Sequence, residues 1–189
     1  EIQDQLDDIT GDNIDKVKLV TEMGDAVQTT AIAVRNVILV TEESERAPEV
    51  KRIFDQREKY DKNAKTLTEM VKSEFGKALL VKIEAARAQT RPLVDKTIAL
   101  GQANNDVEAT KVLLTEVRPG QRKWLDALDE MTQFQEKNTA KAVEGAHITY
   151  GNARLLVWSV TIAALIAGVL VALFSTKSIT KPINTAVTF

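Results

Sequence analysis

The chain has 189 residues and a formal net charge of −2, so it lacks the basic excess that is typical of nucleic-acid-binding proteins. It has no cysteine, which excludes disulfides, thiol nucleophiles and zinc–thiolate sites, and only one histidine. Glycine and proline are scarce and helix-forming residues are abundant, which favours an all-α fold with long helices.

The first part of the chain has the pattern of a long helix. Apolar or small residues recur every three or four positions from Ile2 to Ile38, as in helical bundles and coiled coils. The spacing predicts one helix over residues 1–43. Pro48 suits the first turn of a second helix, which extends to about Ser73.

Gly76 marks the next predicted turn, and a third helix of similar length extends from there to Gly101. A fourth helix follows the turn at residues 104–106, where Asn105 and Glu108 resemble a capping box. It has no later break, so it is expected to continue into the apolar run near the C-terminus. Its buried positions are predicted to be Val107, Thr110, Leu114, Val117, Gln121, Trp124, Leu128 and Met131.

These lengths predict an antiparallel four-helix bundle with two long and two short helices, because short turns make neighbouring helices antiparallel. The short helices cover only part of the long pair, which leaves an apolar seam uncovered on helices one and four. We therefore expect a homodimer or another homo-oligomer. Gln135 and Asn138 lie on this seam, where they either set the register of an interface or face water.

A run of 20 residues without a charged side chain, Leu155 to Phe174, follows the fourth helix. As a helix it is long enough to cross a membrane, and the alternative is a buried core helix. Trp158 lies near one end, as interfacial aromatic residues do, and Lys177 follows the other end. Lys177 and Lys181 follow the run with no acidic residue nearby, which favours that side as cytoplasmic, so we expect the net-negative residues 1–153 outside the cytoplasm.

The order of long helix, two short helices, long helix and membrane span resembles the periplasmic sensor of bacterial methyl-accepting chemotaxis receptors. The segment Ser178–Ile183, with Lys181 and Pro182, resembles the start of a HAMP domain, and the pair Arg35–Asn36 resembles a recurrent feature of these sensors. The resemblance implies a periplasmic ligand-binding domain at 1–153, an inner-membrane helix at 154–176 and a truncated HAMP start at 177–189.

The same resemblance leaves the output open, because histidine kinases and cyclases also use such sensors. A membrane-anchored structural bundle without a ligand is a further alternative. Catalysis has no support in the sequence, which contains no Gly-rich phosphate loop, no Glu-x-x-His pair and no nucleophile–base pattern. We expect no enzyme activity, no metal and no cofactor, and we expect the single His147 to face solvent or an interface.

Four arginines form the candidate ligand site. The turns predicted near residues 44–47 and 103–105 lie at the same end of the bundle, which we call the distal end. Counting along the helices from these distal turns places one arginine of each helix at a common depth. Guanidinium groups suit bidentate binding of carboxylates. We expect a small organic acid or amino acid to bind a subset of them, with two nearby hydroxyls. The alternative is that the arginines pair with Asp55, Asp61, Asp95 and Glu116. The candidate ligand-binding residues are Arg35, Arg57, Tyr60, Thr90, Arg91 and Arg118.

Overall fold

The computed structural model describes the backbone of residues 2–187 and the side chains of residues 11–176. The described backbone is helical and contains no strand. Its elements are α1 (Ile2–Leu39), α2 (Glu43–Met70), α3 (Glu74–Gln102), α4 (Asp106–Val112), the π-helical turn η1 (Leu113–Val117) and α5 (Arg118–Val187). Residues up to Ala142 form one compact unit, and residues from Val143 onward form a second.

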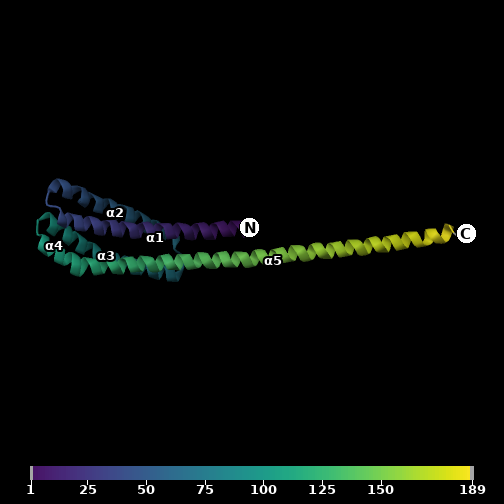
Figure 1. The fold of residues 1–189 in the computed structure, drawn as a ribbon. Helices are drawn as coiled ribbons and strands as arrows, with labels where there is room; N and C mark the ends of the chain where they lie inside the picture. Colours follow the sequence, from purple (N-terminus) through teal and green to yellow (C-terminus); the bar gives the residue numbers. More distant parts are fainter. Residues whose placement is uncertain (1, 188–189) are drawn as a thin grey trace. The chain divides into compact units, whose positions relative to one another are not determined.

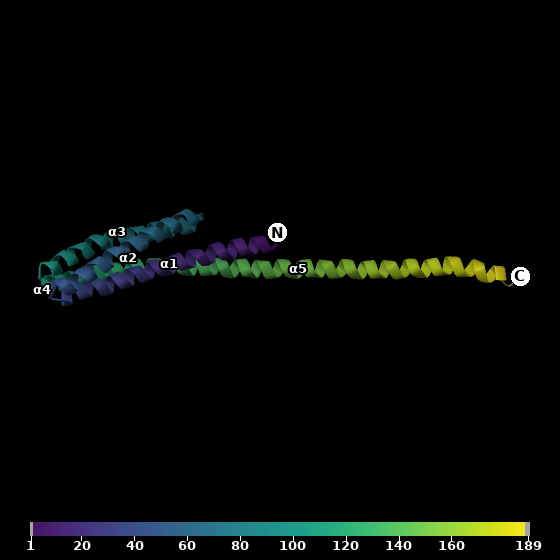
Figure 2. The ribbon, with the colours of Figure 1, turned by 90° about the horizontal axis from the view of Figure 1, so that it is seen from above.

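The first unit is an antiparallel four-helix bundle, which confirms the predicted fold class. The turns that join α1 to α2 and α3 to α4 lie at one end of the bundle, and the turn between α2 and α3 lies at the other (Figures 1 and 2). The fourth helix of the bundle consists of α4, η1 and the first part of α5. The two short helices, α2 and α3, have 28 and 29 residues, against 38 in α1.

The first turn lies earlier than the sequence predicts. α1 ends at Leu39 rather than near residue 43, and α2 begins at Glu43, so Pro48 lies inside α2 instead of opening it. The cause is a side chain that the sequence does not single out. Arg46 donates hydrogen bonds to the carbonyl groups of Val40 and Thr41, which would otherwise lack partners because the helix ends there.

Two other predicted turn features differ in detail. α3 begins before Gly76, because Ser73 caps it and accepts a hydrogen bond from the Gly76 amide at 3.2 Å. The predicted capping box at the fourth helix is wrong, since the Asn105 side chain makes no cap hydrogen bond. The turn depends instead on Asn104, whose φ of 55° is a left-handed conformation that asparagine tolerates.

The fourth helix departs from regular α-helical geometry directly before Pro119. In η1 the amide of Arg118 donates to the carbonyl of Leu113, five residues earlier. Pro119 follows directly, and in a regular helix its ring clashes with the carbonyl four residues before it. The wider π turn relieves that crowding.

The π turn also explains an error in the predicted buried face. Ala109, Val112 and Leu113 are buried, whereas the predicted Leu114 is 52% exposed and Val107 is 84% exposed. One extra residue in the turn displaces the buried positions before it by one. After the turn the predicted positions are confirmed: Val117, Gln121, Trp124, Leu128 and Met131 are buried.

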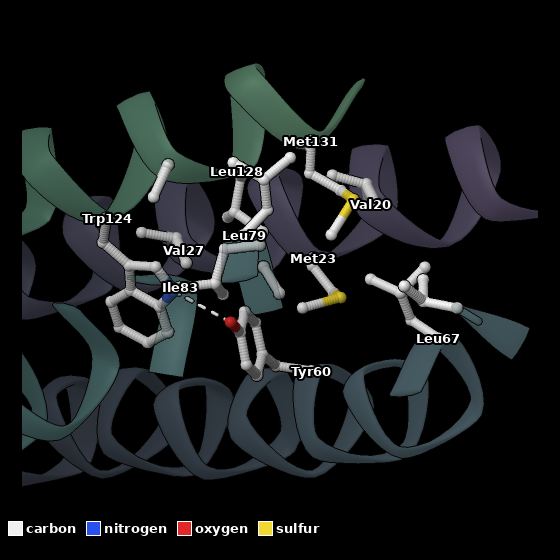
Figure 3. Packing of buried hydrophobic residues seen from close by; sticks show 13 residues of the cluster. Val20, Met23, Val27, Tyr60, Leu67, Leu79, Ile83, Trp124, Leu128 and Met131 are labelled. Carbon is white, nitrogen blue, oxygen red and sulfur yellow. Dashed lines mark hydrogen bonds between the residues drawn. The ribbon is translucent and has the colours of Figure 1, made fainter. Parts of the chain in front are cut away.

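The bundle has two apolar clusters along its length. The cluster nearer the distal turns contains Ala33, Val34, Val37, Ile38, Ile53, Val94, Ile98, Ala109, Val112, Leu113 and Val117. The second cluster, drawn in Figure 3, contains Val20, Met23, Ala26, Val27, Tyr60, Leu67, Val71, Leu79, Ile83, Trp124, Ala127, Leu128 and Met131. Gln135 is 2% exposed and so does not face water, and Asn138 is partly buried.

The second unit contains the apolar run. The helix that holds it is long and apolar enough to cross a membrane, and residues 155–174 are exposed rather than packed in a core. The hydroxyl groups of Ser159 and Thr161 donate to carbonyl groups of their own helix, which satisfies them without water. The side chains of the predicted HAMP start, residues 177–189, lie outside the described residues.

Arg46 joins the two distal turns. Its side chain is buried and donates to the Val40 carbonyl and to Asn104 Oδ1, each at 2.8 Å, and to the Gln102 carbonyl at 3.4 Å. Its charge is therefore balanced by carbonyl groups at the C-terminal ends of α1 and α3, where partial negative charge accumulates, and by the Glu43 carboxylate at 3.6 Å.

We expect Arg46→Ala to lower the free energy of unfolding by roughly 2–4 kcal/mol, because several carbonyl groups lose a charged donor. Urea unfolding followed by circular dichroism measures this. Arg52→Ala is the matched control, since Arg52 is exposed and contacts only Glu49 at 3.4 Å. Equal stability of the two variants contradicts the role of Arg46.

Candidate functional site

The candidate site residues lie around two adjacent hollows in the bundle. Arg57, Tyr60 and Arg91 line an interior cavity, and Arg35 and Arg118 line a groove between α1 and α5. Val27 and Gln121 belong to the walls of both hollows. The four arginines, which were predicted to lie at one depth in the bundle, are therefore divided between two neighbouring hollows on either side of α5. They do not converge on one pocket.

The interior cavity lies between the two apolar clusters, and all four helices of the bundle contribute to it. Its volume is about 20 Å³, which is room for roughly one water molecule. Its walls are Ala26, Val27, Thr30, Gln56, Arg57, Tyr60, Arg91, Val94, Gln121 and Trp124.

Arg91 is held by charge and by aromatic rings. Its guanidinium group donates two hydrogen bonds to Asp61, at 3.0 and 2.7 Å. Its Cζ lies 5.4 Å from the centre of the Tyr60 ring and 5.9 Å from that of Trp124, which is within cation–π range. Arg87 also donates to Asp61, at 2.9 Å.

Arg57 forms an ion pair with Asp95 at 2.5 Å. Both arginines of the interior cavity are thus paired with acids that the sequence analysis named as alternative partners. The other two named acids pair elsewhere, Asp55 with Lys51 and Glu116 with Lys96. Burial acts to raise the pKa of Asp61, but the hydrogen bonds and charges of Arg91 and Arg87 outweigh it, so the pKa is lowered.

Tyr60 and Trp124 form the buried polar contact of the cavity. The Trp124 indole Nε1–H donates to the Tyr60 hydroxyl at 2.9 Å, and the rings meet edge to face with centres 5.0 Å apart (Figure 3). Burial raises the pKa of Tyr60 to about 12, and the hydrogen bond from Trp124 opposes this in part. The phenol is therefore neutral at physiological pH.

Thr90 lines neither hollow and has a packing role. It is fully buried, and its hydroxyl donates to the Ala86 carbonyl of its own helix at 2.7 Å. It faces Gly120, where a Cβ atom would lie 2.7 Å from Thr90 Oγ1. The missing side chain at Gly120 allows α3 and α5 to approach closely beside the cavity.

The groove on the other side of α5 is larger and cationic. Its volume is about 390 Å³, and its charged residues are Arg35, Arg118, Arg122 and Asp126. Among the side chains of residues 11–176, no carboxylate lies within 4 Å of any of the three guanidinium groups. The remaining lining residues are Val27, Gln28, Ala31, Ile32, Gln121 and Leu125.

The sequence analysis missed Arg122 and treated Gln121 only as a seam residue. Arg122 follows Arg118 by four positions, and this spacing places both side chains on one face of a helix. Helical periodicity could therefore have predicted that Arg122 lies beside Arg118. Gln121 is 6% exposed, and its amide makes no hydrogen bond to another described side chain.

The two hollows differ in the chemistry they offer. Each arginine of the interior cavity already has a carboxylate partner, whereas the groove has three arginines and one aspartate. Such a surface attracts anions and suits bidentate binding of a carboxylate. Across the described residues, no group of three or more His, Asp or Glu side chains is arranged to hold a metal ion.

Comparison with known families identifies a match that covers most of the chain. The model of a family described as a four helix bundle sensory module for signal transduction matches residues 1–150. These residues include the bundle and both hollows. A comparison with curated proteins found no match.

The raised pKa of Tyr60 predicts a stability loss at high pH. Folding raises the pKa above the ordinary value of 10, so the stabilisation from the neutral phenol is complete below pH 10 and is lost as the pH rises toward 12. Between pH 9 and pH 11 the wild type should lose about 1–1.5 kcal/mol more than Tyr60→Phe. Urea unfolding of both proteins at pH 9, 10 and 11 measures the difference, and parallel curves contradict it.

Proposed function

Because the chain belongs to the family of four-helix bundle sensory modules of methyl-accepting chemotaxis proteins, we propose that it senses a small carboxylate for a bacterial chemoreceptor. The observation that carries this proposal is the groove, where three arginines on α1 and α5 face one hollow without a carboxylate within 4 Å. An organic acid or amino acid supplies the missing negative charge.

Within the predicted arginine layer, the ion pairs favour Arg35 and Arg118 as the ligand-binding subset, together with Arg122. Arg57 and Arg91 are paired with Asp95 and Asp61, so a carboxylate that binds there competes with an existing ion pair. Binding in the groove requires only the displacement of water. The difference in free energy favours the groove.

The proposed signal travels along α5, because this helix carries Arg118 and also the apolar run. A carboxylate that bridges Arg35 and Arg118 attracts both helices and favours one position of α5 relative to α1. Shifts of about 1–2 Å are typical of helix movements at interfaces. We propose that the membrane span, residues 154–176, conveys this shift to a HAMP domain that starts at residue 177.

We also propose that the sensor works as a homodimer or another homo-oligomer. Ile14, Ile32 and Leu39 are between 51% and 78% exposed on α1. A second copy of the chain that packs against α1 buries this surface, which is otherwise costly to expose to water.

Replacement of an arginine of the groove tests the site. Arg118→Ala in the full chain, reconstituted in lipid nanodiscs, should weaken binding of a carboxylate roughly 10- to 100-fold, the effect of losing a charged hydrogen-bond donor. A calorimetric screen of mono- and dicarboxylates on the wild type identifies the compound. Arg57→Ala is the matched control and should keep the affinity. Loss of binding in Arg57→Ala but not in Arg118→Ala would move the site to the interior cavity.

The membrane orientation is tested separately. In intact cells, a cysteine at Glu43 should react with a thiol reagent that cannot cross membranes, whereas a cysteine at Ser178 should not. The reason is that the lysines after the apolar run favour the cytoplasmic side. Mass spectrometry of the labelled protein gives the result, and labelling at 178 alone contradicts the proposed orientation.

A further inference from the structure

The contact between Tyr60 and Trp124 is placed where it can regulate the groove. It joins α5 to α2 through a buried hydrogen bond of 2.9 Å from Trp124 Nε1–H to the Tyr60 hydroxyl (Figure 3). Two side-chain links from the fourth helix to α3 are ion pairs between half-exposed groups, Lys82 with Glu130 and Lys96 with Glu116. Exposed pairs of this kind restrain a helix weakly.

The hydrogen bond and the groove share one short stretch of α5. Arg118 and Arg122 face the groove, Trp124 faces the interior, and Gln121 lies between them in the wall of both hollows. Any movement of α5 that brings Arg118 closer to a bound anion therefore also moves Trp124 relative to Tyr60. Because both contacts lie on seven consecutive residues of α5, a displacement of this stretch as a unit changes both of them.

The backbone just before this stretch has room to adjust. The π turn ends at Val117, and Pro119 has no amide hydrogen to donate, so the helix is tied less tightly to the preceding residues. Trp124 is the first large buried side chain after this weakly held segment.

We propose that the Tyr60–Trp124 hydrogen bond is a latch that holds α5 in its ligand-free position and thereby lowers the affinity of the groove for carboxylates. This inference rests on the proposed function of the groove. A hydrogen bond weakens steeply once its donor and acceptor separate beyond about 3.5 Å. A shift of α5 by about 1–2 Å takes the pair past that limit, so binding must overcome the latch.

The test is Tyr60→Phe, which keeps the ring and removes the acceptor. With malonate as the probe, titrated by calorimetry into the full chain in nanodiscs, the variant should bind roughly two- to tenfold more tightly, the equivalent of one net hydrogen bond. A merely structural role lowers the melting temperature and leaves the malonate affinity unchanged. Trp124→Phe removes the donor instead and should shift the affinity in the same direction, which keeps the test available if one variant folds poorly.

The control is Lys82→Gln, which removes a link between α3 and α5 away from the groove and should leave the affinity unchanged. An equal gain in this variant, or opposite shifts in Tyr60→Phe and Trp124→Phe, overturns the latch. So does an unchanged affinity in both latch variants when malonate binds the wild type through Arg118.

A second measurement separates the latch from the proposed ligand site. Without malonate, amide hydrogen exchange in residues 118–130 should be faster in Tyr60→Phe than in wild type, with little change in residues 79–90 of α3. If malonate fails to bind the wild type, the groove as a site for this dicarboxylate is contradicted, and exchange alone decides the latch. Equal acceleration in both segments, or none, overturns it.

Discussion

The neutralisation of two arginines inside a four-helix bundle is the constraint on which the rest of the site depends. Arg57 and Arg91 enter the bundle between two apolar clusters, where an unpaired charge is very costly. Asp95 and Asp61 meet them from the more exposed side of α2 and α3. Because these acids are engaged there, the groove on the other side of α5 keeps an excess of positive charge. The placement of two carboxylates thus separates a neutral interior from a cationic surface at the same level.

α5 carries different tasks on its opposite sides in this region. Its inner side holds Trp124, which packs in the core and donates to Tyr60, and Gly120, which allows close contact with α3. Its outer side presents Arg118 and Arg122 to solvent. A helix arranged in this way links core packing to surface charge directly. In the proposed sensor, the affinity of the groove for its ligand therefore depends on how strongly core contacts such as Tyr60–Trp124 restrain α5.

The sequence was sufficient for the fold because the helices are long and strongly periodic, although Pro48 and Gly76 lie inside helices and do not mark their first residues. It predicted how far along the bundle the four arginines lie, but not which of them share a hollow. The direction in which a long side chain points depends on the residues that it contacts. Arg57 and Arg91 turn toward acids of neighbouring helices, which spacing within one helix does not reveal. Arg46 was missed for a related reason: most of its acceptors are backbone carbonyl groups, which have no sequence signature.

The π turn before Pro119 has a consequence for the helical phase of the bundle. Each residue of an α-helix advances the side-chain direction by about 100°, so one additional residue rotates the preceding part of the helix by about that angle relative to the part after the turn. With the turn, Ala109, Val112 and Leu113 point into the distal cluster. In an uninterrupted helix, Thr110 and Leu114 would occupy that direction and place a hydroxyl in the core. The residues before and after the π turn can therefore pack into two apolar clusters that require different rotations of the helix about its axis. The change in rotation falls directly before the two groove arginines of α5.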